Sequence, residues 1–80
     1  MARHSFDIAI LDPPYGMGLI QKTLAGVDTI MNSGGTVVCE HEAGLELPER
    51  IGGLTLRRRY SYGKLVALTV YDKDSENAVD

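Results

Sequence analysis

The sequence predicts an α/β fold, a mixed four-stranded sheet in which a βαβ unit is followed by an antiparallel β-hairpin. Three observations predict it: an apolar run at residues 6–11, a helical spacing of apolar residues after it, and two strand-like segments around "SYG". At 80 residues the chain forms one domain at most. Its 44% apolar and 24% charged residues are typical of a globular protein rather than a disordered one.

The first half of the chain reads as strand, helix, strand. "FDIAIL", residues 6–11, is nearly continuously apolar, which is typical of a strand buried on both faces of a parallel sheet. One helical face then carries apolar residues at spacings of three and four: Met17, Ile20, Leu24, Val27 and Met31. Residues 32–35, "NSGG", are expected to end the helix, and "TVVCE", residues 36–40, to form a second strand parallel to the first.

The second half predicts a hairpin. Residues 42–53 contain one proline and three glycines and are expected to form an irregular connection with at most one helical turn. "LTLRRRY" and "KLVALTVY" flank a turn near residues 61–63. The second arm is apolar on both faces, so it should insert between the second strand and an arginine-bearing edge strand. Residues 72–80 are acidic and are expected to form a loose tail.

The strand at residues 6–11 reads as central, yet nothing before it in this sequence can cover its other edge. Exposed apolar strand edges promote aggregation. We therefore expect residues 1–80 to be a partial domain, paired through this edge with a missing N-terminal half or with a second copy. The single cysteine and the lack of a leader or of 18 consecutive apolar residues favour a cytoplasmic protein without a membrane partner.

A strand-to-helix turn, "DPPY" at residues 12–15, occupies the place where open α/β sheets bind ligands. Pro13 and Pro14 fix the backbone. The Asp12 carboxylate and the Pro13 carbonyl can accept the two hydrogens of an exocyclic amino group on a nucleobase, while Tyr15 stacks on the base. Methylation of that amino group suits these residues. The alternative is a rigid connection without a catalytic role.

Residues 12–15 resemble the Asp/Asn-Pro-Pro-aromatic signature of class I S-adenosylmethionine-dependent methyltransferases that act on nucleobase amino groups. "FDIAILDPPYG", "GGTVVCEHE", "LP" and "RRRYSYGKLVALTVY" together resemble the C-terminal half of RsmD-like 16S ribosomal RNA guanine-N2 methyltransferases, across residues 6–71. The resemblance implies part of a Rossmann-like sheet, S-adenosylmethionine as cofactor and ribosomal RNA as partner. It also implies that Asp12, Pro13, Pro14 and Tyr15 bind the target guanine.

The cofactor-binding loop and acid of that family would lie upstream of Met1. "NSGG" cannot replace them, because its glycines precede a strand rather than open a helix. The chain alone is therefore expected to be inactive. Two alternatives stay open: a fragment of a DNA adenine-N6 methyltransferase, and a non-catalytic truncated domain that dimerises.

The remaining candidates carry weaker signals. The net charge of −3 means that any RNA-binding surface must be a local cluster of basic residues. Arg57, Arg58 and Arg59 are such a cluster, and they either contact the RNA backbone or keep an edge strand soluble. Cys39 is expected in the core. His41 is expected at a solvated strand end, because neighbouring strand residues point to opposite faces and His41 cannot share a metal ion with both flanking glutamates.

Overall fold

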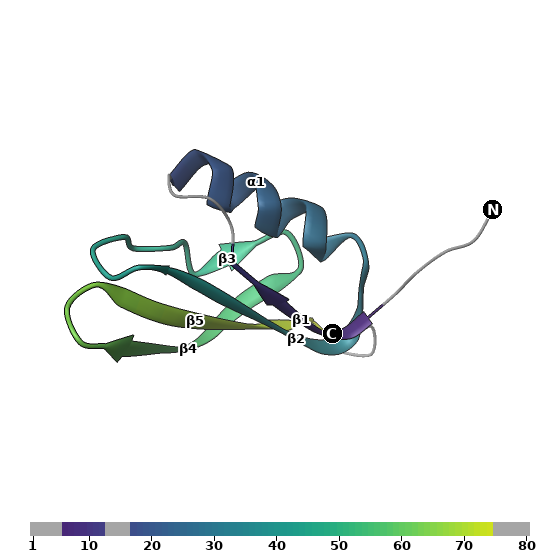
Figure 1. Ribbon diagram of the computed structural model, residues 1–80. Coiled ribbons are helices and arrows are strands. Elements are labelled where there is room, and N and C mark those ends of the chain that lie inside the picture. The colour runs from purple at the N-terminus through teal and green to yellow at the C-terminus, as the bar shows by residue number, and fades with distance from the viewer. Residues whose placement is uncertain (1–5, 13–16, 75–80) are drawn as a thin grey trace.

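A five-stranded mixed sheet with one helix packed on it makes up the fold (Figure 1). The structure is a computed structural model that describes residues 6–12 and 17–74. The elements are β1 (Phe6–Leu11), α1 (Met17–Asp28), β2 (Met31–Glu42), β3 (Arg50–Ile51), β4 (Leu54–Tyr62) and β5 (Val66–Lys73). The predicted α/β class is confirmed, although the sheet gains a fifth, two-residue strand, β3, that the sequence did not suggest.

The strand order is β1-β2-β5-β4-β3. β1 and β2 are parallel, as expected for a βαβ unit, and the other pairs are antiparallel. β5 lies between β2 and β4, which confirms its predicted insertion. β5 continues through Asp72 and Lys73, so the first residues of the expected tail belong to the sheet instead. Residues 75–80 lie outside the described residues.

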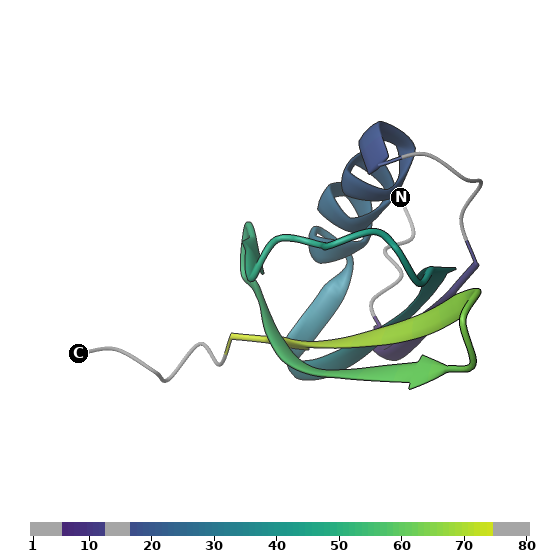
Figure 2. The ribbon, with the colours of Figure 1, turned by 90° about the vertical axis from the view of Figure 1, so that its left-hand side faces the viewer.

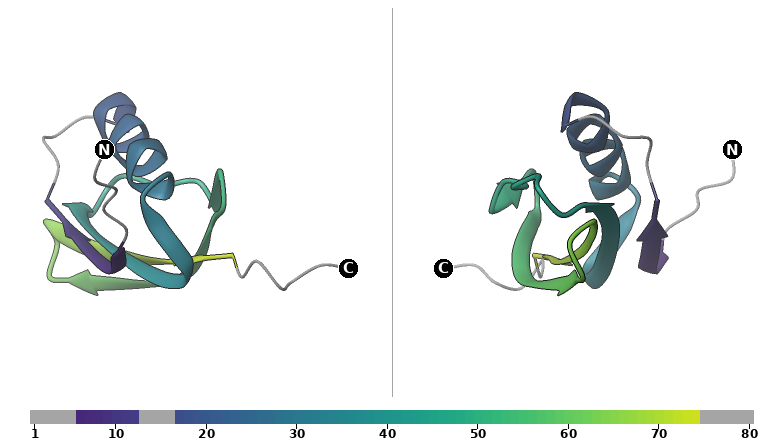
Figure 3. Two further views of the ribbon diagram at one scale, coloured as in Figure 1. Left: turned by 90° about the vertical axis from the view of Figure 1, so that its right-hand side faces the viewer. Right: turned by 60° about the vertical axis from the view of Figure 1, so that its left-hand side comes forward.

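α1 covers one face of the sheet, which we call the helix face (Figures 2 and 3). Its Ile20 and Leu24 side chains are buried there. The sheet contributes further buried residues to the same cluster: Met31, Val37, Cys39, Leu54 and Tyr71. Removal of this apolar surface from water is the main force that holds α1 against the strands. Among residues 6–12 and 17–74, no helix is long and apolar enough to cross a membrane.

The helix is shorter than its apolar spacing predicts. It ends at Asp28, and Met31, expected on the helix, begins β2. "NSGG" lies inside β2 rather than in a connection. Phe6 pairs with Met31 but Ile8 pairs with Thr36, so residues 32–35 form a bulge. Gly34 has φ 79° there, a conformation that glycine adopts without strain. β2 therefore contains both residues 32–35, which were expected to end the helix, and residues 36–40, which were expected to form the strand.

Residues 43–49, which we call the strap, cross the helix face without a helical turn. Leu47 is buried in the core, and the Tyr71 hydroxyl donates to the Pro48 carbonyl oxygen at 2.6 Å. Leu56 N–H donates to the Glu49 carbonyl oxygen at 2.7 Å. These contacts fix the strap over β4 and β5.

The opposite face of the sheet, the open face, has no helix among the described residues (Figure 1). Ile8 is 66% exposed and Ile10 is 79% exposed on this face of β1, and β1 is an outer strand of the sheet. The sequence predicted burial on both faces for β1, and its helix-facing residues Ala9 and Leu11 do pack against the core. The exposed isoleucines show that, within this chain, β1 is not buried on the open face as predicted.

Candidate functional site

The carboxyl ends of β1 and β2 meet at one corner of the sheet. Leu11 pairs with Cys39, so Asp12 and Glu40 follow at neighbouring positions of two parallel strands. A small cavity of about 30 Å³ is bounded there by Asp12, Glu40, His41, Glu42, Leu65 and Val66. We call these six residues the carboxyl corner.

Asp12, the first residue of the "DPPY" turn, is exposed at this corner. Its location beyond the end of a parallel strand is the one that ligand sites of open α/β sheets use. Pro13, Pro14 and Tyr15, the other predicted base-binding residues, lie outside the described residues.

The side chains of the carboxyl corner point to two different faces of the sheet. Residues of β2 alternate between faces, and Cys39 and His41 are buried on the helix face. Glu40 and Glu42 therefore point to the open face. Leu65 is 80% exposed beside them, and Val66 is half-buried. The corner combines carboxylate oxygens, which only accept hydrogen bonds when ionised, with an exposed apolar side chain.

His41 is not at a solvated strand end, which corrects the sequence-based expectation. It is 4% exposed. Its Nδ1 lies 2.9 Å from the Glu42 carbonyl oxygen, and its Nε2 lies 2.7 Å from the Thr69 hydroxyl. A carbonyl oxygen only accepts, so Nδ1 carries a proton, and in the neutral ring Nε2 accepts the Thr69 hydroxyl proton. His41 thus ties β2 to β5 directly beneath the corner.

Cys39 is buried in the core, as expected. Burial, with a smaller effect of the nearby Asp12 carboxylate, raises the pKa of its thiol from 9.0 to about 11. Thiolates rather than thiols are nucleophilic, so Cys39 is unsuited to catalysis at neutral pH. Within the part of the chain that the structure describes, no group of three metal-ligating residues is placed to hold a metal ion.

The three arginines expected to face RNA do not share one surface. A bulge between Leu56 and Arg58 separates their directions. Arg57 pairs with Asp72 at 2.8 Å, and Arg58 lies over the Tyr60 ring, 5.5 Å from its centroid. Arg59 turns to the helix face, where its guanidinium donates to the Ala43 carbonyl oxygen. Arg58 therefore stays with Tyr60 on the open face, while Arg59 holds the strap.

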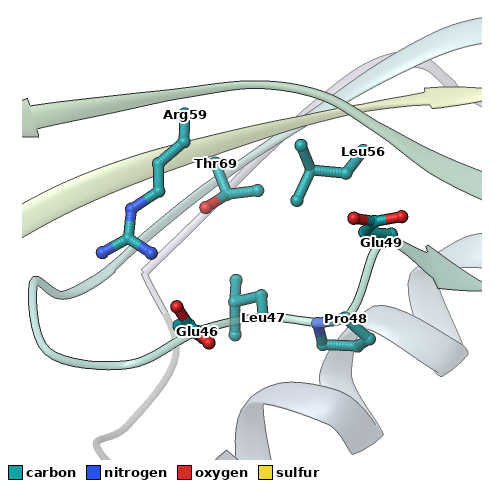
Figure 4. A pocket seen from close by; sticks show the side chains of 7 residues that line it. All are labelled: Glu46, Leu47, Pro48, Glu49, Leu56, Arg59 and Thr69. Atoms are coloured by element: carbon teal, nitrogen blue, oxygen red, sulfur yellow. The ribbon is translucent and has the colours of Figure 1, made fainter.

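A larger cavity lies between the strap and the helix face of the sheet. It measures about 460 Å³ and is lined by strap and sheet residues, which Figure 4 shows: Glu46, Leu47, Pro48, Glu49, Leu56, Arg59 and Thr69. Size alone favours this cavity as a ligand site. The Arg59 guanidinium in this cavity already donates to the Ala43 carbonyl oxygen. The "DPPY" motif, which indicates a catalytic role, begins at the carboxyl corner. We therefore assign the candidate site to the carboxyl corner.

The cofactor that the sequence resemblance implies is S-adenosylmethionine. Such cofactors bind where a glycine-rich loop opens a helix. Gly34 and Gly35 lie within β2 instead, and a side chain at Gly35 would approach the Met31 side chain within 2.7 Å. These glycines were expected to precede a strand, and they lie within one instead, so neither of them opens a helix.

Strand order, crossover helix and closing hairpin define a mixed α/β fold found in methyltransferases. Residues 1–72 match the family described as "Conserved hypothetical protein 95", and the chain belongs to this family. The RsmD-like resemblance of the sequence is thereby confirmed.

Individual relatives agree with this family. "Putative rRNA methyltransferase YlbH" of Bacillus subtilis is 35% identical over 65 residues, which cover 79% of this chain and 35% of YlbH. A conserved hypothetical protein of Streptococcus pyogenes superposes with a TM-score of 0.78 at 29% identity, over 91% of this chain and 46% of that protein. "Putative methylase HI0767" of Haemophilus influenzae superposes with a TM-score of 0.73 at 19% identity, over 94% and 43% of the two chains. The chain spans less than half the length of each.

Proposed function

We propose that this chain is the target-base half of an S-adenosylmethionine-dependent methyltransferase that methylates guanine N2 in 16S ribosomal RNA. The observation that carries the proposal is Asp12 at the carboxyl end of β1, where the "DPPY" signature begins. The name of the Bacillus subtilis relative supports ribosomal RNA as the substrate class. Because the proposed substrate is ribosomal RNA, the proposed location of this activity is the cytoplasm.

The chain's part in the reaction is to hold the base. The lone pair of an exocyclic amino group is delocalised into the ring, and positive charge develops on that nitrogen as it is alkylated. Asp12 and the Pro13 carbonyl accept the amino hydrogens and stabilise this charge, Pro14 fixes the turn, and Tyr15 stacks on the extruded base. S-adenosylmethionine supplies the methyl group, and its site belongs to the other half of the enzyme.

The partner of the chain is the remaining part of the methyltransferase sheet. The relatives are more than twice as long as the aligned region. β1 is an outer strand, so its free edge can pair with a further strand, and its exposed isoleucines offer apolar surface beside that edge. A second copy of this chain is the rival occupant. Once that sheet is complete, Arg58, Tyr60 and Tyr62 provide a cation and two exposed rings for RNA backbone contact and stacking.

The test combines the chain with a polypeptide that supplies the missing length, such as the part of YlbH that the chain does not match. The pair is incubated with S-adenosylmethionine and unmodified 16S ribosomal RNA, and the digested nucleosides are analysed by mass spectrometry. N2-methylguanosine is the expected product. N6-methyladenosine instead would establish the adenine alternative, and no methylated base would refute the proposal.

Asp12→Ala should reduce this transfer by at least about 100-fold, because an acceptor that stabilises the developing charge is lost. The control is Asp7→Ala at the other end of β1, where Asp7 accepts from Asn32 Nδ2 at 2.9 Å. Both variants should keep the circular dichroism spectrum of the wild type. Unaltered turnover in Asp12→Ala would contradict the assignment of Asp12.

Titration of the chain alone with S-adenosylmethionine in a calorimeter should give no binding heat, because the described residues lack the cofactor loop. Adding the complementary polypeptide should restore binding. A one-to-one complex with the isolated chain would show that these residues build the cofactor site themselves and would favour an enzyme active without its other half.

A further inference from the structure

We propose that Glu40 selects guanine over adenine at the carboxyl corner by accepting the N1–H of the target base. The inference rests on the proposed function, because it presumes that Asp12 binds the exocyclic amino group. It goes further by naming the residue that reads the rest of the base edge.

The position of Glu40 follows from strand register. Cys39 is the partner of Leu11, so Glu40 is the β2 residue beside Asp12 on β1. Cys39 is buried on the helix face, and Glu40, the next residue, is exposed on the open face. Asp12 is exposed as well. Both residues border the same small cavity. Neighbouring strands are about 4.8 Å apart, so the two carboxylates can reach different donors of one base rather than compete for the same one.

The edge of guanine suits two acceptors. Guanine presents the N1–H and the two hydrogens of its N2 amino group side by side. An ionised carboxylate has acceptors only, so Asp12 suits the amino group and Glu40 suits N1–H. Adenine also has an amino group, but its neighbouring N1 is an acceptor. A carboxylate that faces this lone pair is repelled and loses its own solvation without gaining a partner.

The surroundings fix Glu40 and place an exposed apolar side chain at the same corner. Its backbone is held in the ladder between β2 and β5, where it pairs with Leu68. His41, the next residue, is anchored to Thr69 at 2.7 Å, so this segment of β2 is well fixed. Leu65, 80% exposed at the same corner, offers an apolar side chain against which a ring can pack.

Glu42 is the other glutamate of the corner, and it is a poorer candidate. It lies two residues beyond Glu40 and pairs with Val66, at the end of β2 that leads into the strap. A strand rises about 3.3 Å per residue, so Glu42 is displaced by about 6.6 Å along the strand from the position beside Asp12.

The binding test uses the 80-residue chain labelled with ¹⁵N and titrated with GMP, IMP and AMP, followed by backbone amide shifts. The wild type should bind GMP more tightly than AMP. IMP, which keeps N1–H but lacks the amino group, should fall between them. Glu40→Gln should reduce the GMP preference over AMP about tenfold, since a charged acceptor is lost and an amide donor now faces adenine N1.

A control variant carries the same change of charge. Glu46→Gln tests an exposed glutamate on the strap, which does not belong to the carboxyl corner. It should keep the wild-type GMP to AMP ratio. An unchanged ratio in Glu40→Gln, equal binding of GMP and AMP by the wild type, or no binding of any nucleotide would overturn the inference.

The methyl-transfer assay separates this inference from the proposed function. If the completed enzyme forms N2-methylguanosine and Glu40→Gln still discriminates against adenine as the wild type does, the role of Glu40 fails while the function holds. If the completed enzyme methylates no base, the proposed function fails. A rise in the N6-methyladenosine fraction in Glu40→Gln, absent from Glu46→Gln, would support both.

Discussion

His41 lies between two glutamates near the end of a strand, a context that suggests solvent exposure, yet its ring is buried and bonded at both nitrogens. Its partner Thr69 is 28 positions away, and no local pattern links the two residues. Asp12 could be placed from the sequence because its position depends only on the end of β1. The remaining residues of the carboxyl corner could not, because their proximity depends on strand register.

Cys39 gives a prediction at the residue scale. Its thiol should react slowly with iodoacetamide at pH 8 in the folded chain and rapidly in denaturant, because burial raises its pKa to about 11 and closes access. The pKa is higher in the folded state than in the unfolded one, so the stabilising difference is complete below pH 9 and is lost as the pH rises through 11.

Urea titrations at pH 7, 9 and 11 measure this loss as a falling free energy of unfolding. Tyr71 acts in the same direction, because burial raises its pKa to about 12. Cys39→Ala is therefore the informative comparison, since it should flatten the part of the decline that begins near pH 9. A decline identical to that of the wild type would contradict the role of Cys39.

At the scale of elements, types were predicted more reliably than boundaries. β1, α1, β4 and β5 follow from apolar patterns that span many residues. The start of β2 was missed because "NSGG" reads as a stop signal, whereas Gly34 accommodates a bulge within the strand. The short β3 was missed because its two residues depend on pairing with Leu54 and Thr55, not on their own sequence.

The end of α1 is held by a clamp of Asp28, Gly53 and Lys73. Lys73 Nζ donates to Asp28 Oδ1 at 2.5 Å and to the Asp28 carbonyl oxygen at 2.8 Å, and Gly53 N–H donates to Asp28 Oδ1 at 3.1 Å. The Lys73 and Asp28 side chains are 21% and 17% exposed. The lysine also offsets the negative end of the helix dipole.

Lys73→Met should lower the free energy of unfolding by about 2 kcal/mol, because it leaves a mostly buried carboxylate without its cation. Urea unfolding measures the change. The matched control is Arg50→Met, which breaks the exposed pair with Asp74 and should cost less than about 1 kcal/mol. Equal losses in the two variants would contradict the clamp.

On the scale of the whole molecule, the sequence predicted that β1 needs a partner, and the structure places β1 at the outside of the sheet with two exposed isoleucines. That β1 has a partner stays a prediction, because burial of a strand on both faces is a property of the complete sheet. A partner for the open face could not be predicted from these residues, since no pattern within them identifies a surface that would cover it.

Without the complementary polypeptide, we expect the chain to self-associate through β1. Ile10→Lys should convert it to a monomer, because a charge then lies in the apolar contact. Leu19→Lys, which changes an exposed leucine of α1, should leave the association unchanged. Sedimentation velocity distinguishes these states. A monomeric wild type, or an associated Ile10→Lys chain, would contradict pairing through this strand.

The middle position of β5 affects how the molecule folds. β5 pairs with β2 on one side and β4 on the other, while no direct pairing joins β2 to β4. During synthesis, β1, α1, β2 and β4 all leave the ribosome before the strand that connects them. The sheet therefore cannot close until Lys73 has emerged, and folding should occur as one late, cooperative event that depends on contacts distant in sequence. A chain that stopped before β5 would leave the β1–β2 pair and the β3–β4 pair without the strand that joins them.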